Sequence, residues 1–158
     1  MDCNEIFLNE VTHVELVKAS ACTIPIPANA KAVTELSGCT IGTATMVIDS
    51  NDNDSYTGVL DSAPTLKSSQ KDQVAGRLRQ HDLTLNVRYN YNKVRKAVDE
   101  LQGVDFYVVL RTADGTRYLL YALPNSSRVT VEGQFGAAEP KQTVKVSLQS
   151  LSNMIQLT

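Results

Sequence analysis

The sequence predicts a mainly β fold of the α+β class: an antiparallel β-sandwich or open barrel with one short helix packed against it. Several short segments alternate apolar and polar residues, turn-forming residues separate them, and one stretch has helical spacing. No strand–helix–strand repeat favours a parallel sheet. The 158 residues, 42% of them hydrophobic, fit a single β-rich domain over residues 1–158 with a core of its own.

Extended segments in the first half are broken by turn-forming residues. Residues 11–18 (VTHVELVK) alternate loosely and predict a strand. Two prolines restrict residues 22–29 to an edge strand or an irregular crossing. Residues 38–49 (GCTIGTATMVID) are rich in Thr, Val and Ile and predict one further strand. Residues 56–64 (YTGVLDSAP) resume an extended character as far as their terminal proline.

A long polar stretch follows at residues 65–82. Val74 and Leu78 have helical spacing, but Gly76 lies between them and the stretch runs directly into a strand pattern. We expect a flexible loop that becomes an extended arm, so that a long polar loop or arm occupies about residues 49–81. Loops of this length are usually functional or interaction elements.

The clearest strand and the helix are adjacent. Residues 82–91 place five apolar or aromatic side chains on one face, namely Leu83, Leu85, Val87, Tyr89 and Tyr91. The period then changes, because apolar residues recur at i, i+3, i+4 and i+7, as Val94, Ala97, Val98 and Leu101. Asn92 is placed to cap this helix and Gly103 to end it.

The rest of the chain predicts strands and turns. Asp114-Gly115 is a hairpin signal, and residues 124–127 (PNSS) predict the next turn. Residues 104–112 are apolar on both faces, which predicts a buried strand. Further strands are expected at residues 116–123, 128–135, 141–151 and 154–158, which brings the total to about eight.

The most acidic stretch, DSNDNDSYTG at residues 49–58, invites comparison with a calcium-binding loop. Asp49, Asn51 and Asn53 match the first three EF-hand ligand positions. Asp54 stands where that loop needs glycine, and Leu60 where it needs a bidentate glutamate. The match is one of composition, and the stretch predicts an acidic turn between two strands.

Catalytic and metal-binding chemistry finds no recognisable pattern. Cys3, Cys22 and Cys39 are widely spaced, which indicates reduced, mostly buried thiols. His13 and His81 are the two histidines, and no phosphate-binding loop or nucleophile motif occurs. We therefore expect a protein that is not an enzyme, with no catalytic, cofactor-binding or metal-binding residues.

Charge is unevenly distributed. Residues 32–66 contain five acidic and no basic residues, whereas residues 67–96 contain eight basic and two acidic residues. These segments can pair within one molecule or between neighbouring copies, where complementary patches set orientation. The candidate oligomer contacts are Asp49, Asp52, Asp54, Asp61, Lys67, Lys71, Arg77 and Arg79.

Other partner classes are disfavoured. Tyr89 and Tyr91 share a face with apolar residues, which favours a core position over a base-stacking platform, and the net charge of −2 argues against sequence-specific nucleic-acid binding. No apolar run is long enough to span a bilayer. The first residues are acidic and lack the pattern of a secretory signal. We expect no membrane partner.

The order strand, helix, long hairpin, strand resembles the tail-tube and head–tail connector ring proteins of tailed bacteriophages. It is carried by LTLNVRYNYNKVRKAVDELQG, VDFYVVLRTADGTRYLLYALPN and KQTVKVSLQSL, within residues 82–151. The resemblance is to a pattern of elements and covers about 70 residues. In that group a β-sandwich or barrel with one helix assembles into a ring around a DNA channel, and long loops or hairpins reach adjacent subunits.

The resemblance implies a virion structural protein made in the host cytoplasm, forming a homo-oligomeric ring or tube at the head–tail connector or tail. It implies neighbouring ring or tail proteins as partners, non-specific passage of DNA, and no catalytic residues. Two alternatives remain open: a small β-sandwich module that binds a ligand or protein, and a hydrolase with dispersed catalytic residues.

Overall fold

The computed structural model describes residues 11–25, 35–51, 56–73, 76–88, 91–133, 141–151 and 154–158. This part of the chain contains thirteen strands and one α-helix, which confirms the mainly β, α+β class. Eleven strands form one folded sheet, and β2 (Cys22–Thr23) pairs with β4 (Thr40–Ile41) in a second, small one. A 3-10 turn (Ala19–Ala21) joins β1 to β2.

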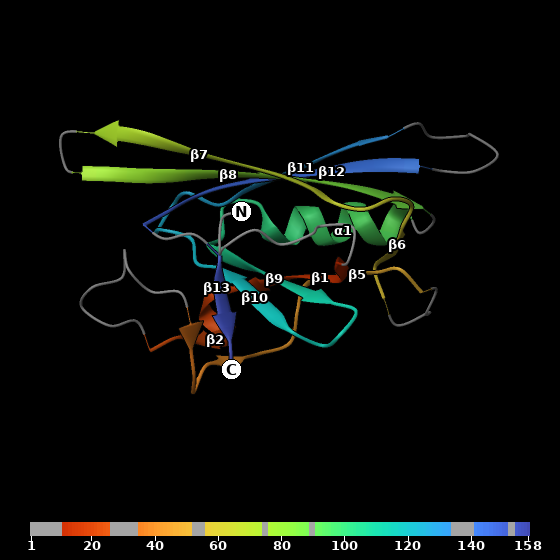
Figure 1. The fold of residues 1–158 in the computed structure, drawn as a ribbon. Coiled ribbons are helices and arrows are strands. Elements are labelled where there is room, and N and C mark those ends of the chain that lie inside the picture. The colour runs from red at the N-terminus through yellow and green to blue at the C-terminus, as the bar shows by residue number, and fades with distance from the viewer. Residues whose placement is uncertain are drawn as a thin grey trace.

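The large sheet folds into two layers (Figure 1). We call the upper one the hairpin layer; it comprises β7 (Thr65–Gln73), β8 (Gly76–Arg88), β12 (Lys141–Ser150) and β11 (Arg128–Gly133), in that order. The lower one, the central layer, comprises β5 (Met46–Asp49), β1 (Val11–Lys18), β9 (Phe106–Thr112), β10 (Arg117–Leu120), β13 (Ile155–Leu157) and β3 (Glu35–Leu36).

The short strand β6 (Gly58–Leu60) joins the two layers. It pairs in parallel with β5 of the central layer and antiparallel with the end of β8 in the hairpin layer. All three β6 residues are buried. A second parallel pair links β13 to β3, and the remaining pairs are antiparallel.

The main core fills the space between the layers. Alternation explains its composition, because every second side chain of β8 and β12 faces inward, including Leu83, Leu85, Val144 and Val146. Phe106 of β9 is its largest fully buried side chain. A second core on the outer face of the central layer contains Leu36, Val109, Leu119, Ile155 and Leu157.

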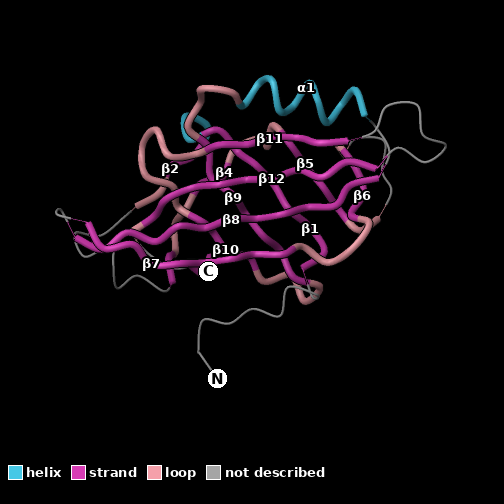
Figure 2. Tube along the Cα trace, turned by 90° about the horizontal axis from the view of Figure 1, so that it is seen from above, coloured by secondary structure: helices cyan, strands magenta, loops and turns pink. Residues whose placement is uncertain are grey.

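Helix α1 (Tyr91–Leu101) lies along one side of the two layers, next to β11 (Figure 2). Its buried residues Val94, Ala97, Val98 and Leu101 are those with helical spacing in the sequence. The helix ends at Gly103, whose φ of +71° suits a glycine C-cap, as expected. Asn92 was expected before the helix but lies in its first turn, since α1 begins at Tyr91.

Several predicted segments differ from the structure. The stretch 65–82, expected to be a flexible loop and arm, forms β7 and the first half of β8 in one hairpin. Its inward positions carry polar side chains such as Ser68 and His81, so no apolar period marks it as a strand. The predicted strand 82–91 is part of β8 as far as Arg88, residues 89–90 lie outside the described part, and residue 91 belongs to α1.

The predicted strand 38–49 is two strands, β4 and β5, separated by residues 42–45. Gly42 lies in this break, and the chain packs so closely against Ala21 there that a Cβ would clash with the Ala21 carbonyl oxygen. The predicted segment 22–29 forms a strand only at residues 22–23, and residues 26–34 lie outside the described part. Predicted strands 11–18, 104–112, 116–123, 128–135, 141–151 and 154–158 correspond to β1, β9, β10, β11, β12 and β13.

Candidate functional site

Strand β7 of the β7–β8 hairpin exposes most of its described side chains. Its ladder runs from Thr65, opposite Thr84, to Gln73, opposite Gly76. In the described part of the chain β7 pairs with β8 alone, so its second edge presents unpaired backbone donors and acceptors. The hairpin tip also extends beyond its neighbours, to the left in Figure 1, because β12 accompanies β8 only as far as Arg79.

At the opposite edge of the hairpin layer, β11 is shorter and partly covered. The side-chain amide of Gln102, just after α1, donates a 2.8 Å hydrogen bond to the Val129 carbonyl oxygen. Helix α1 packs against the same strand. The two edges of the hairpin layer therefore differ: that of β7 is long and uncovered, whereas that of β11 is short and partly satisfied within the subunit.

The outer face of the hairpin layer is polar. One row across the layer runs from Lys67 through Asp82 and Ser147 to Arg128. Gln80 cross-links this face, since its Nε2 donates to Asp82 Oδ1 at 3.1 Å and to Ser147 Oγ at 2.6 Å. The face mixes both signs of charge with neutral hydrogen-bonding groups, a composition suited to contact with water or a hydrated polymer.

A depression of about 260 Å³ lies on this face, lined by Asp82, Leu83, Thr84, Arg128, Thr130, Lys145, Val146 and Ser147. A second depression of about 170 Å³ lies between α1 and the start of β6, lined by Thr45, Tyr56, Thr57, Lys93, Lys96, Ala97 and Glu100. Both are small compared with the volumes typical of ligand pockets.

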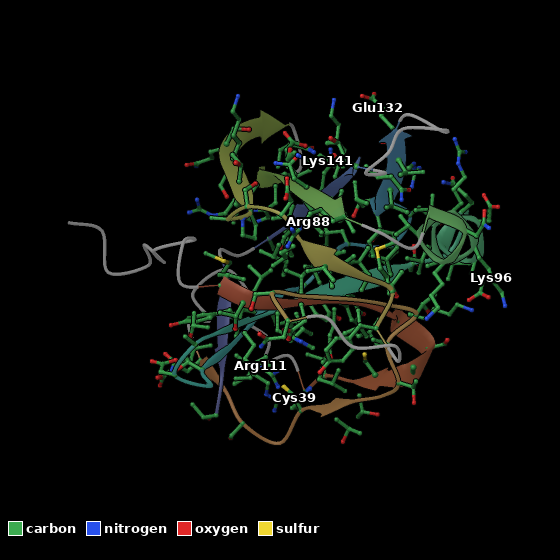
Figure 3. The ribbon with its side chains drawn as sticks, turned by 90° about the vertical axis from the view of Figure 1, so that its right-hand side faces the viewer. Cys39, Arg88, Lys96, Arg111, Glu132 and Lys141 are labelled. Atoms are coloured by element: carbon green, nitrogen blue, oxygen red, sulfur yellow. The ribbon has the colours of Figure 1, made fainter. Side chains whose placement is uncertain are left out.

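The eight predicted contact residues have different positions. Asp61 forms ion pairs within the subunit, 3.2 Å from Arg88 Nε and 3.7 Å from Lys141 Nζ; Figure 3 shows both basic residues in the upper part of the molecule. Acidic and basic segments thus meet within one chain here. Lys67 is exposed on β7 and Arg79 half-buried on β8.

Asp49 is also engaged within the subunit, because it is buried and bonded to His13. Lys71 and Arg77 lie in the hairpin strands, opposite Leu78 and Asp72 respectively, but their side chains are outside the described part. Asp52 and Asp54 also lie outside the described residues.

A buried polar cluster forms on the outer side of the central layer, around His13. His13 Nδ1 lies 2.7 Å from Asp49 Oδ2 on the neighbouring strand β5, and Nε2 lies 3.0 Å from Glu15 Oε1 on its own strand. Arg111 of β9 lies 3.9 Å from the same Asp49 oxygen. The Tyr56 ring packs edge-on against the imidazole, with ring centroids 5.7 Å apart.

Electrostatics favour a charged imidazole in this cluster. The hydrogen bond to Glu15 raises the pKa of His13 above its ordinary value of 6.5, with Asp49 adding to the effect and burial and Arg111 opposing it. The same bond lowers the pKa of Glu15 below 4.5. With both ring nitrogens bonded to carboxylates, His13 has no nitrogen left to act as a base toward a substrate.

A second histidine is paired with a hydroxyl. The Oγ of Ser68 on β7 lies 2.7 Å from Nδ1 of the buried His81 on β8. A serine–histidine contact is one part of a nucleophilic site, which also needs donors for an oxyanion and a substrate cleft. Neither depression described above is lined by Ser68 or His81.

The described cysteines show no sign of activation. Burial raises the pKa of both Cys22 and Cys39, which keeps the thiols protonated and poorly nucleophilic. Burial also raises the pKa of Tyr107, whose ring stacks on Tyr121 at 4.8 Å in the second core. No group of three or more His, Cys, Asp or Glu side chains is arranged to hold a metal ion among the described residues.

Sequence reasoning missed the His13 cluster. A signal existed for one half of it, because His13 and Glu15 are two apart in a predicted strand and so share a face. Nothing local links His13 to Asp49, 36 residues away, until β1 and β5 pair and bring them opposite each other.

No protein-family model, curated protein or solved structure matches this chain. Within the described residues, no helix has both the length and the apolar character needed to cross a membrane. The function must therefore be argued from the geometry of the chain.

Proposed function

We propose that this chain is a non-enzymatic structural protein that assembles into a homo-oligomeric ring or tube through its β7–β8 hairpin. The observation that carries the proposal is the edge of β7: nine residues paired on one side only within the described part of the chain. Natural proteins usually shorten or cover such an edge when it has no partner.

The order of strands supports a head-to-tail contact. The hairpin layer has β7 at one edge and β11 at the other, so the β7 edge of one copy can meet the part of the next copy's β11 edge that lies beyond Val129, whose carbonyl oxygen Gln102 already occupies. Alternate strands of this layer run in opposite directions, so β7 and a neighbour's β11 are antiparallel when all copies face the same way. Heterologous contacts of this kind produce rings when the rotation closes.

Charges on the edge favour a specific partner over indiscriminate pairing. Lysines on an edge strand discourage random strand addition, and β7 contains Lys67 and Lys71. The edge strand β11 contains the exposed Glu132, which lies 3.7 Å from Lys145 in the same subunit. β7 also contains Asp72, so its net charge is +1 (two lysines against one aspartate), and β11 also contains Arg128, so it has no net charge. Two β7 edges therefore repel each other more than a β7 edge and a β11 edge do.

The outer face of the hairpin layer supports the idea of a channel. Joined edge to edge, hairpin layers would form one continuous polar surface, with Gln80, Ser147 and Asp82 already bonded to one another. Such a surface binds phosphates weakly because its charges are mixed in sign, and this suits non-specific passage of DNA.

The resemblance of residues 82–151 to tail-tube and head–tail connector ring proteins supports placing this ring in the virion of a tailed bacteriophage, at the connector or in the tail. Its other partners would then be neighbouring ring or tail proteins. Under this proposal no residue of the chain is catalytic and no cofactor is needed.

The decisive experiment removes the overhang of the hairpin together with four of the nine residues of the β7 edge. Residues 70–79 are replaced by Asn-Gly. This two-residue turn connects Ser69 to Gln80, which already lie opposite each other in the ladder. The purified full-length protein is expected to form rings or tubes in electron micrographs and a large species in light scattering. The shortened variant is expected to keep its circular dichroism spectrum and to remain monomeric.

Glu35→Lys provides a charge-changing control, because Glu35 is exposed on β3, at the opposite end of the strand order from β11 and in the other layer from β7. This variant should assemble like the natural chain. A natural chain that stays monomeric at all concentrations and salt conditions would overturn the proposal. So would a folded, shortened variant that still assembles normally.

One observation favours a second candidate function, a small binding module. The depression of about 260 Å³ on the outer face of the hairpin layer offers Arg128, Lys145 and Asp82 to a polar ligand or protein. This candidate predicts a monomer in solution. Measuring the mass of the purified protein therefore separates the two functions.

A further inference from the structure

We propose that His13 is a proton-operated clasp. In its protonated form it holds both Asp49 of the neighbouring strand β5 and Glu15 of its own strand β1; on losing the proton it keeps Asp49 and releases Glu15 toward Arg111 and Arg117. The clasp makes the charge of the outer surface of the central layer depend on pH. It lies in the layer opposite the hairpin and does not depend on assembly.

Both ring nitrogens of His13 are engaged by carboxylates. Each imidazole nitrogen lies within hydrogen-bond distance of a carboxylate oxygen, 2.7 Å at Nδ1 and 3.0 Å at Nε2. An imidazolium donates from both nitrogens, whereas a neutral imidazole donates from one and presents a lone pair at the other. A lone pair facing a carboxylate is repulsive, so deprotonation must break one of the two contacts.

The surroundings decide which contact breaks. Asp49 is 5% exposed, and each of its oxygens has a partner: Oδ2 has His13 and the more distant Arg111, and Oδ1 accepts a 2.8 Å bond from the Asn51 backbone N–H. Moving this carboxylate would leave a buried charge poorly solvated. The Glu15 side chain is 29% exposed and can turn to solvent.

Two arginines offer Glu15 alternative partners once it leaves His13. Arg111 lies opposite His13 in the β1–β9 ladder, so it is on the face that His13 and Glu15 share, and both Arg111 and Arg117 lower the pKa of the Glu15 carboxyl. The two arginines lie opposite each other in the β9–β10 ladder. The groups that face the clasp are therefore Glu15 from β1, Asp49 from β5, Arg111 from β9, Arg117 from β10 and Tyr56 from the segment before β6.

Deprotonation has two consequences for the molecule. The proton leaves Nε2 for solvent, so one positive charge is lost from this surface. Glu15 then pairs with Arg111 or Arg117, which lowers the positive charge that this surface offers to an anionic partner. The neutral imidazole keeps its proton on Nδ1 and continues to hold β1 to β5 through Asp49. The clasp therefore changes surface charge while the strand pairing persists.

Histidine titration in the full-length protein tests the clasp. Deuterium exchange at the imidazole C2 position, followed by mass spectrometry, reports His13 and His81 in separate peptides at any particle size. Nitrogen and carboxyl-carbon NMR shifts report the tautomer of His13 and the state of Glu15. We expect the neutral His13 to carry its proton on Nδ1, and the Glu15 carboxyl shift to change at the pH where His13 deprotonates.

Three variants test the roles of Glu15 and Asp49 in the titration of His13. Glu15→Gln should lower the pH midpoint of His13 and leave the proton of the neutral form on Nδ1. Asp49→Asn should abolish the Nδ1 preference. Glu132→Gln, the same chemical change on an exposed residue of the other layer, should alter neither property.

Stability provides a measurement that needs no variant. The raised pKa of His13 gives stability that is fully present below pH 6.5 and is lost as the pH rises through the folded-state pKa of His13. The lowered pKa of Glu15 gives stability that is present above pH 4.5 and is lost as the pH falls through the folded-state pKa of Glu15. The cluster should therefore stabilise the protein most between pH 4.5 and pH 6.5.

A neutral His13 with its proton on Nε2 would overturn the proposal. So would a Glu15 shift with no step at the His13 midpoint, or equal effects of Glu15→Gln and Glu132→Gln.

Discussion

At the scale of single residues, buried polar groups distinguish this chain from an apolar sandwich. His13 and Asp49 satisfy each other across two strands, and Ser68 satisfies His81 within the hairpin. Gln142 differs from these pairs. It is 2% exposed on β12, and neither polar atom of its amide has a hydrogen-bond partner within the described structure.

An unsatisfied buried amide costs free energy, since it has lost its bonds to water without replacing them. We predict that Gln142→Met, which keeps the length and flexibility of the side chain, raises the free energy of unfolding by about 1–2 kcal/mol. Denaturant unfolding of both proteins measures this.

Gln80→Met is the matched control, because the Gln80 amide donates to both Asp82 and Ser147. Losing those bonds should leave that variant no more stable than the natural chain. A Gln142→Met variant that is less stable than the natural chain would contradict the prediction that this amide is unsatisfied.

At the scale of elements, helix α1 shows how local signals and packing agree. Its four apolar positions all face the core, and its end coincides with a glycine. Gly103 has φ of +71°, and apart from its chain neighbours no described residue has an atom within 4 Å of where its Cβ would be. Any cost of adding a side chain there is therefore conformational rather than a clash.

Gly103→Ala is expected to lower the free energy of unfolding by about 1 kcal/mol, because alanine is strained in the left-handed region. Thermal and denaturant unfolding both give this value. Glu100→Ala, an exposed change in the same helix, should stay within about 0.5 kcal/mol of the natural chain. Equal stability of the Gly103→Ala and natural proteins would contradict the C-cap assignment.

At the scale of the whole molecule, the two layers depend on the three residues of β6. This strand is the point at which the sheet passes from β5 to β8, and Gly58 lies at its start. A Cβ on Gly58 would lie 2.4 Å from Val87 Cγ1, a branched and buried side chain of β8. The close approach of the layers at this point therefore requires glycine.

We predict that Gly58→Ala destabilises the protein by about 1–3 kcal/mol through overpacking at this joint. Val87→Ala, which removes the clashing methyl group, should recover part of that loss in the double variant. The cycle of both single variants and the double variant measures the coupling by denaturant unfolding. Strictly additive effects would rule out the clash as the cause.

The sequence by itself determined the class, most strands and the helix. Period-two alternation marked β1 and the apolar half of β8, helical spacing marked α1, and Asp114-Gly115 and Gly103 marked a turn and a helix end. These signals are local, because backbone geometry and turn chemistry act over a few residues. These local signals were enough to predict the fold class, although they do not show which elements pack against each other.

Only the tertiary structure decided the features on which function depends. The segment 65–82 is a strand hairpin because β8 and β12 provide a ladder for it, although its polar side chains alone favour a loop. Asp49 is hydrogen-bonded to His13, and Asp61 forms ion pairs with Arg88 and Lys141, because strands that are distant in the chain lie side by side. Charge partners and polar strand pairs are set by long-range contacts, and a sequence pattern does not contain those distances.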